Sequence, residues 1–247
     1  MILTLFETLI AVASAAAGAW IAATAPVSHR NLCALISFAA GTFLAAALAH
    51  IVPEALHLLS PAPVAVALLS GYLLFYLISR YVFHVCPACA ASHFDHPEHD
   101  LRKTAFLMVI ALSVHIILDG TAIAAGHALG ARTAFSILLI ITIHKFPEGL
   151  ALCALLLKAG FQKTKALVLT VAIEGLTLAG WVLGALLSKN PGAAGFSTWL
   201  LVHIGGGFIY LALHAAINES KEHSPRFVLF FFLLGVALVS LTHLMPE

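Results

Sequence analysis

Eight long apolar runs fill almost the whole of the 247-residue sequence, and they limit what this chain can fold into. Cutting the sequence at charged and Pro- or Gly-rich stretches bounds them at about residues 2–25, 32–57, 62–83, 104–128, 133–157, 164–188, 197–217 and 226–245. Each run is long enough to cross a bilayer as a helix, which takes about 20 residues. Backbone polar groups in lipid must be satisfied within the segment, and continuous apolar runs suit helices better than barrel strands. The sequence therefore predicts an all-α, polytopic membrane protein with eight transmembrane helices.

The composition excludes a soluble fold and a nucleic-acid partner. Hydrophobic residues make up 62% of the sequence and charged residues only 9%, where a soluble domain carries about 25% charged residues. The 12 Lys and Arg residues nearly balance the 11 Asp and Glu residues, so there is no basic surplus with which to hold a phosphate backbone. We expect the lipid bilayer as the surroundings and residues 1–247 as a single eight-helix transmembrane domain.

The basic residues favour one orientation in the membrane. Nine of them fall in the loops on one side: Arg30, Arg80, Arg102, Lys103, Lys158, Lys163, Lys165, Lys221 and Arg226. The other side holds only Arg132 and Lys189. Cytoplasmic loops of membrane proteins carry the excess of Lys and Arg, so the bias predicts an N-out/C-out topology with both termini outside the cytoplasm.

This topology makes the most polar stretch of the chain, residues 84–103, a cytoplasmic Cys/His-rich loop. It offers soft and borderline metal donors at Cys86, Cys89, His93, His96 and His99. A single CPAC beside several histidines could bind a dication loosely, as a relay or a sensor. The alternative is a flexible, solvated loop with reduced thiols.

Three of the predicted helices carry ionisable residues near mid-depth. The fourth has His115 and Asp119 in HIILDG, the fifth has His144, Lys145 and Glu148 in HKFPEG, and the sixth has Glu174. A charged residue at the bilayer centre costs about 3 kcal/mol on insertion scales, so function is the default explanation. His115, His144 and Glu174 lie about ten to twelve residues into their spans, which places them at one level.

In the fourth and fifth helices a carboxylate follows a histidine by four residues, so both side chains project from one face. If the helices face each other, His115, Asp119, His144 and Glu148 surround a point near the midplane. This nitrogen and oxygen donor set suits zinc and also other first-row dications. The alternative is a set of interhelical hydrogen bonds and a salt bridge that only fix the packing.

Charge counting predicts that this metal site holds one ion. Asp119, Glu148 and Glu174 contribute −3 and Lys145 contributes +1, so a single divalent cation neutralises the group. Two dications would leave an excess of +2 in a medium of low dielectric constant, which is strongly unfavourable. We expect Lys145 to occupy the place of a second ion, near Glu174.

Similar segments recur in opposite orientations along the chain. HIILDGTAIAAG aligns with HKFPEGLALCAL on the next, oppositely directed helix, and HIVPEA near the end of the second run echoes HAAINES near the end of the seventh. Such inverted repeats are typical of transporters that bind substrate at the repeat interface. His50 with Glu54 and His214 with Glu219 are then candidate outer and inner gates, or ordinary polar residues at helix ends.

The sequence resembles the ZIP (Zrt/Irt-like protein) family of divalent metal transporters, prokaryotic type. The resemblance rests on HIILDG, HKFPEGLAL, EGLTLAGW and GTFLAAALAHIVPEAL, and it spans nearly the whole chain. It implies a homodimer in the bacterial inner (plasma) membrane that takes up zinc, iron, manganese or cadmium into the cytosol without an organic cofactor. It also implies an elevator-like, alternating-access motion of helices one, four, five and six against two, three, seven and eight.

The family often has a binuclear centre, whose first site would map onto His115, Asp119, His144 and Glu148. This sequence departs from that pattern at Ile116, where Asn is usual, and at Lys145, where an acidic or polar ligand is common. Both departures agree with a site for one metal ion.

Two other classes of function compete with a transporter. A catalytic zinc also needs few His and carboxylate ligands, so an intramembrane zinc-dependent hydrolase is the main alternative. The sequence has no HExxH motif and no convincing Gly-x-Ser-x-Gly elbow, and we therefore predict that the protein is not an enzyme. A receptor-like metal sensor that uses the loop at 84–103 is the third class.

Overall fold

A computed structural model describes residues 2–25, 28–82, 101–127, 130–188 and 194–244 of the chain, and helices are the only regular elements in these ranges. They are α1 (Ile2–Thr24), α2 (His29–Ala45), η1 (Ala46–Ile51), α3 (Val52–Leu58), α4 (Pro61–Leu77), η2 (Ile78–Val82), α6 (Leu101–Gly126), α7 (Ala131–Lys158), α8 (Lys163–Glu174), α9 (Leu176–Ser188), α10 (Ala194–Glu222), α11 (Pro225–Ser240) and η5 (Leu241–Leu244). The all-α prediction is confirmed.

Six of the helical rods are long and apolar enough to cross a membrane. Their bounds are Ile2–Thr24, His29–Leu58, Pro61–Tyr81, Ala131–Lys158, Lys163–Leu187 and Gly195–Glu222. Two shorter apolar helices, Leu112–Gly126 within α6 and Pro225–Ser240, lie at the other two predicted spans. The structure therefore supports an integral membrane protein with six candidate spans. The Cys/His-rich loop, with Cys86, Cys89, His93, His96 and His99, lies outside the described residues.

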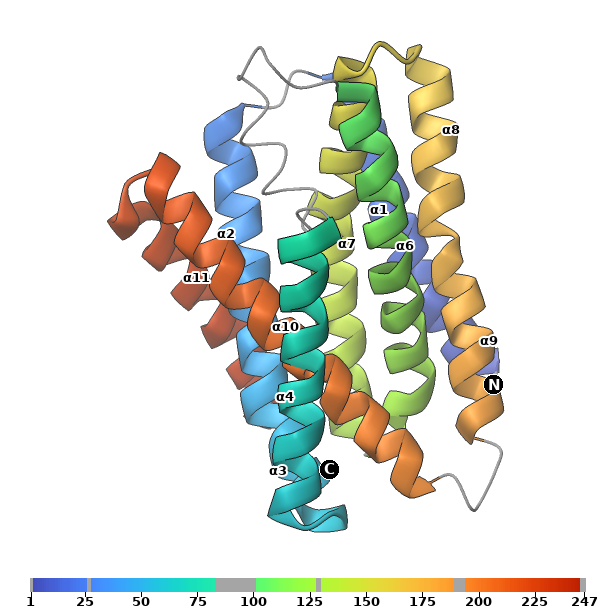
Figure 1. The fold of residues 1–247 in the computed structure, drawn as a ribbon, viewed down its shortest axis with the longest axis vertical. Coiled ribbons are helices and arrows are strands. Elements are labelled where there is room, and N and C mark those ends of the chain that lie inside the picture. The colour runs from blue at the N-terminus through green and yellow to red at the C-terminus, as the bar shows by residue number, and fades with distance from the viewer. Residues whose placement is uncertain (1, 26–27, 83–100, 128–129, 189–193, 245–247) are drawn as a thin grey trace.

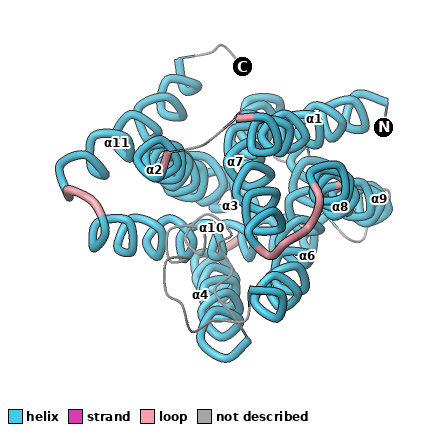
Figure 2. The backbone as a smooth tube through the Cα atoms, turned by 90° about the horizontal axis from the view of Figure 1, so that it is seen from above, coloured by secondary structure: helices cyan, strands magenta, loops and turns pink. Residues whose placement is uncertain are grey.

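The helices form two bundles that meet along one seam (Figures 1 and 2). One, which we call the α7 bundle, contains α1, α6, α7, α8 and α9, with α1 packed along α7 and α6 packed along α9. The other, the α10 bundle, contains α2, η1, α3, α4, α10 and α11, with α2 packed along α11 and α4 along α10. Contacts between bundles are sparser and run mainly from α7 to α2 and from α6 to α10.

Reciprocal glycines hold each of these four helix pairs together. A Cβ atom at Gly149 of α7 would overlap the carbonyl oxygen of Ala15 in α1, and one at Gly18 of α1 would overlap that of Phe146 in α7. The same mutual approach to the partner's backbone occurs at Gly120 and Gly180, at Gly41 and Gly235, and at Gly71 and Gly206. Small residues that let helix backbones touch are the usual basis of association in lipid. Each bundle is therefore packed backbone against backbone.

Two of the predicted uninterrupted spans contain a local departure from α-helix. In the second span, Pro53 has no N–H group to offer the carbonyl of Ala49, and the preceding turn widens so that the N–H of Val52 donates to the carbonyl of Ala47. In the sixth, the helix breaks at Gly175, and the hydroxyl of Thr177 donates to the carbonyl of Glu174 at 2.7 Å. The second break lies next to one of the predicted site residues.

Candidate metal site

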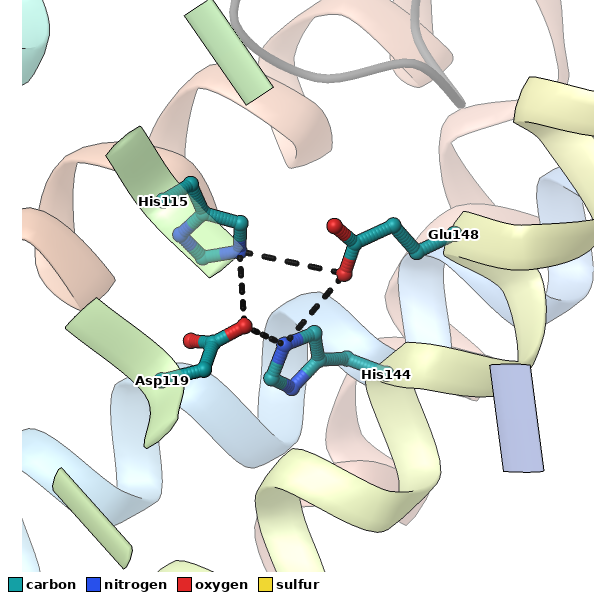
Figure 3. A group of neighbouring side chains, drawn as sticks. All are labelled: His115, Asp119, His144 and Glu148. Atoms are coloured by element: carbon teal, nitrogen blue, oxygen red, sulfur yellow. Dashed lines mark hydrogen bonds and ion pairs between the residues drawn. The ribbon is translucent and has the colours of Figure 1, made fainter. Parts of the chain in front are cut away.

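Two histidines and two carboxylates meet between α6 and α7, deep within the molecule. The ligand atoms of His115, Asp119, His144 and Glu148 all lie within 4.8 Å of one another. Figure 3 shows His115 and Asp119 projecting from α6 toward His144 and Glu148 from α7. Their exposed fractions are 5, 0, 4 and 5%, so all four are closed off from the surface. The i, i+4 spacing on each helix produces this arrangement, because it stacks the two side chains on one face.

The distances among the four residues suit a small dication. His144 Nε2 lies 3.2 Å from Asp119 Oδ2 and 3.6 Å from Glu148 Oε2, and His115 Nε2 lies 3.6 and 4.0 Å from the same two oxygens. Nitrogen and oxygen ligands of a tetrahedral zinc ion, each about 2.05 Å from the metal, stand about 3.4 Å apart. The four separations between a histidine nitrogen and a carboxylate oxygen, 3.2 to 4.0 Å, are therefore close to the value that a zinc ion would impose, and the other two are within 4.8 Å.

The backbone fixes which nitrogen of His144 faces the centre. Nδ1 lies 3.0 Å from the carbonyl oxygen of Ile140, one turn earlier in α7, and donates its proton to it. In the neutral ring this leaves a lone pair on Nε2, which points at Asp119 Oδ2. At 3.2 Å this lone pair repels the carboxylate unless a proton or a metal cation lies between them. The ring is thus oriented as a metal ligand, with a backbone carbonyl in the supporting position.

Buried carboxylate oxygens supply a second indication. Asp119 Oδ1 and Glu148 Oε1 are buried and make no hydrogen bond with any residue that the structure describes. A buried acceptor without a partner is costly, and more so when it carries charge. A bound cation would offset that cost, whereas a purely structural hydrogen-bond cluster would leave it in place. The donor chemistry therefore fits a metal ion better than packing alone.

Lys145 joins three carboxylates beside the four ligand atoms. Its side chain is completely buried, and Nζ lies 2.9 Å from Glu174 Oε2, 3.0 Å from Asp119 Oδ2 and 3.2 Å from Glu148 Oε2. Glu174, the last residue of α8, contacts this ammonium group and does not join the group of four ligand atoms. The ammonium group thus lies where acids from α6, α7 and α8 meet, and it takes up part of their negative charge.

Three phenylalanine rings of the α10 bundle cover the histidines. The ring centroid of Phe43 in α2 lies 4.4 Å from that of His144, Phe75 in α4 lies 5.8 Å from His115, and Phe208 in α10 lies 6.4 Å from His144. All three rings are buried. The cluster therefore lies on the seam, with its donors on the α7 bundle and an apolar cover on the α10 bundle.

The predicted outer gate consists of His50 and Glu54, and the structure gives His50 a network of hydrogen bonds. His50, in η1, is buried, and its Nε2 lies 2.9 Å from the hydroxyl of Thr242 in η5. That hydroxyl lies 3.0 Å from the hydroxyl of Ser136 in α7, so the network bridges the seam. Glu54 lies half-buried on α3. The structure places His50 at a contact between bundles.

The two residues of the predicted inner gate, His214 and Glu219, have different neighbours among the contacts described. His214 stacks on Tyr210, with centroids 5.3 Å apart, and its Nε2 lies 2.9 Å from Asn218 Nδ2. Glu219 is buried on α10 and lies with Cys33 and His223, whose ligand atoms are all within 4.8 Å of one another. The contacts described for the two residues involve different neighbours, and the inner gate stays a prediction.

Sequence reasoning missed two features around these sites. It assigned no role to Phe43, Phe75 and Phe208, because an aromatic residue in an apolar span gives no sign of which neighbour it faces. It also assigned no role to Cys33. The Glu-x-x-x-His spacing of Glu219 and His223 repeats the i, i+4 rule of the central site in reverse order, and it was a signal that could have been used.

Comparison with known proteins points to one family. A family model described as "ZIP Zinc transporter" matches residues 90–243, which is more than half of the chain. The chain is 30% identical over 151 residues to zinc transporter zipt-7.2 of Caenorhabditis elegans, with 58% of this chain and 32% of the relative covered. It is 28% identical over 163 residues to zinc transporter ZIP13 of Danio rerio, with 63% and 45% covered. For zinc transporter YKE4 of Saccharomyces cerevisiae the identity is 26% over 244 residues, with 85% and 70% covered. The chain thus spans less than half the length of the first two relatives.

Proposed function

Because the chain belongs to the ZIP zinc transporter family, we propose that it carries a divalent transition-metal ion, zinc foremost, across a membrane and into the cytosol. Iron, manganese and cadmium are further candidate substrates, because imidazole and carboxylate donors overlap in their metal preferences. The relatives are named as zinc transporters, which gives no support to the hydrolase alternative. The metal is the substrate in this proposal, and no organic cofactor takes part.

The observation that carries the proposal is the buried group of His115, Asp119, His144 and Glu148 on the seam between two bundles. A hydrated ion would exchange its water molecules for two imidazole nitrogens and two carboxylate oxygens. Ionisable groups inside a membrane segment mark substrate pathways far more often than they serve packing. The oxygens that face both histidines, Asp119 Oδ2 and Glu148 Oε2, are the acceptors that such an ion would use.

The two-bundle organisation supports alternating access by an elevator-like motion. Every proposed ligand lies on the α7 bundle, whereas the rings that cover the ligands belong to the α10 bundle. A displacement of one bundle along the other would carry the ligands past those rings and expose them to the other side. Within each bundle, the glycine contacts would keep the helices together during this movement.

We propose that the site holds one ion at a time. The Lys145 ammonium group, 2.9 to 3.2 Å from three carboxylate oxygens, supplies positive charge where a second dication would otherwise be needed. With Lys145 present, the three acids and one dication sum to neutrality. The sequence argument for a mononuclear centre and these contacts agree.

The topology that we propose has eight spans and inverted repeats, with both termini outside the cytoplasm. It rests on the basic residues that lie at helix ends, since the positive-inside bias assigns their face to the cytoplasm. All nine lie in the described part of the chain: Arg30, Arg80, Arg102, Lys103, Lys158, Lys163, Lys165, Lys221 and Arg226. A homodimer stays a prediction from the resemblance. The bacterial inner membrane is an expectation that the eukaryotic relatives do not support; a membrane location is what the family and the spans support.

Uptake of zinc into proteoliposomes tests the proposal. Purified protein should give saturable uptake, and Glu148→Ala should abolish it, because one of two carboxylate ligands is removed and the ammonium group of Lys145 loses a partner. The matched control is Glu222→Ala, which removes an exposed carboxylate at the end of α10 and should leave uptake unchanged. Uptake by a correctly folded Glu148→Ala protein at the original rate would overturn the proposed site.

Metal content tests the single-ion part separately. Purified protein should bind one zinc ion in the central site. Lys145→Glu should allow a second zinc ion to bind there, because the substitution removes the ammonium group and adds a fourth carboxylate to the three native ones. The control Lys163→Glu reverses an exposed charge at the start of α8 and should add none to the central site. A native central site that already binds two ions would contradict the role of Lys145.

A further inference from the structure

A second group of metal-binding side chains lies at the far end of the α10 bundle. Cys33, near the start of α2, meets Glu219 and His223, near the end of α10, and the three ligand atoms lie within 4.8 Å of one another. Cys33 and Glu219 are each 1% exposed, whereas the side chain of His223 is 20% exposed. The group is therefore buried on one side and open to the surface on the other.

The geometry of this group resembles that of the central site. His223 Nδ1 lies 3.5 Å from Glu219 Oε2, close to the separation of about 3.4 Å for two ligands of a tetrahedral zinc ion. His223 Nδ1 is buried and makes no hydrogen bond with a described residue. The Nδ1 atom of His223 therefore lies near the carboxylate of Glu219 and the thiol of Cys33 as an available donor.

The donor set differs from the central one in a way that matters for metal choice. A thiolate, a carboxylate and an imidazole favour zinc, and softer ions such as cadmium even more, over magnesium and calcium, which prefer oxygen ligands. Three protein donors leave one position of a tetrahedral ion for water, as in exchangeable zinc sites.

We propose that Cys33, Glu219 and His223 form a second binding site for a soft divalent cation, zinc or cadmium, at the end of the α10 bundle. All three residues belong to the α10 bundle, so the site would stay in place when the α7 bundle moves. In the proposed topology this end faces the cytoplasm, and a fixed thiolate there could receive the released ion. Only that receiving role rests on the proposed function; the site itself rests on the three donors.

Cadmium binding to the purified full chain tests the site, because cadmium bound to a thiolate gives a charge-transfer band in the ultraviolet. Cys86 and Cys89 are first changed to Ser, so that their thiols cannot contribute. This background protein should bind two cadmium ions per chain and show the band. Cys33→Ser in that background should remove the band and one of the two ions.

Three comparisons make the result specific. Cys153→Ser removes the buried thiol of α7 and should leave both the band and the stoichiometry unchanged. Glu148→Ala should remove one ion but keep the band, so that failure of the central site and failure of the second site give different results. Persistence of the band in Cys33→Ser, its absence from the background protein, or its loss in Cys153→Ser would each overturn the proposal.

A second variant covers the case in which Cys33→Ser does not fold. His223→Ala changes a partly exposed side chain in the bend directly after α10. It should weaken the cadmium affinity measured from the band by at least about tenfold, since even residues that only support a ligand are worth about 10–100-fold. His57→Ala, an exposed histidine on α3, is the control. An unchanged affinity in His223→Ala would overturn the proposal.

Discussion

The contacts inside each bundle involve the helix backbones, whereas the contacts along the seam involve side chains. Inside a bundle, a glycine of one helix lies against the backbone of its partner, as Gly149 does against Ala15 and Gly41 does against Phe232. Along the seam, the described contacts are made by whole side chains, with the rings of Phe43 and Phe208 over His144. Backbone-to-backbone contacts leave no room for sliding, whereas side chains can change rotamers and neighbours. The difference suggests where the molecule is rigid and where it can move.

Enlarging a glycine within a bundle should have the largest effect. Gly149→Leu would force α1 away from α7, because a side chain there meets the carbonyl of Ala15. Overpacking alone costs about 1–3 kcal/mol, and a backbone that cannot relax raises the cost above that range. We expect little or no folded protein by size-exclusion chromatography and thermal unfolding in detergent. Gly195→Leu, where a Cβ has open space, is the control; if both variants folded equally well, the packing argument would be wrong.

Lys145→Met should have the next largest effect, because Lys145 links three helices of the α7 bundle by charge. The variant leaves Asp119, Glu148 and Glu174 buried without their common cation. Removing one partner from a buried ion pair costs about 3–5 kcal/mol. The thermal midpoint of the metal-free protein should fall, and added zinc should recover part of the loss. Lys163→Met should not shift the thermal midpoint. An equal shift in both variants would show that the buried ion pairs of Lys145 do not stabilise the protein.

A covalent link across the seam should stop transport without unfolding the protein. The hydroxyl oxygens of Ser136 and Thr242 lie 3.0 Å apart on opposite sides of the seam. With the native cysteines changed to Ser, the pair Ser136→Cys and Thr242→Cys should form a disulfide on oxidation. Zinc uptake should then fall to background and return after reduction. Undiminished uptake by fully cross-linked protein would show that the bundles need not move at this point.

Trimming a ring on the seam should have the smallest effect. Phe208→Leu keeps an apolar side chain beside His144 and should cost about 1 kcal/mol, because a hydrophobic swap of similar volume is usually tolerated. Thermal unfolding should show a small shift, and zinc uptake should remain measurable. A loss of folded protein as large as that expected for Gly149→Leu would remove the distinction between the two kinds of interface.

The fold class and the convergence of the central residues could be predicted because they follow from local rules. Span length gives helices, and a His with a carboxylate four residues later gives two donors on one face, as in His115 with Asp119 and His144 with Glu148. Charged residues in lipid are expensive enough that they must converge. That these residues bind metal stays a prediction until the experiments above are done.

The remaining features depend on which helices become neighbours, and the sequence does not specify that. The mutual contacts of Gly18 and Gly149 are visible only once α1 lies along α7. Cys33 meets Glu219 and His223 only because α2 lies beside α10 at that level, although the three residues come from distant parts of the chain. The helix break at Gly175 was missed because a single glycine is tolerated in many helices.

The near-complete burial of the four central donors has a consequence for selectivity. With exposed fractions of 5% or less, the proposed ligands would receive an ion only after most of its hydration shell has been removed. Magnesium gives up its water reluctantly and gains little from imidazole, whereas zinc recovers the loss through two nitrogen bonds. If the central group binds an ion as proposed, the phenylalanine cover would add a dehydration cost that zinc recovers through its nitrogen ligands and magnesium does not.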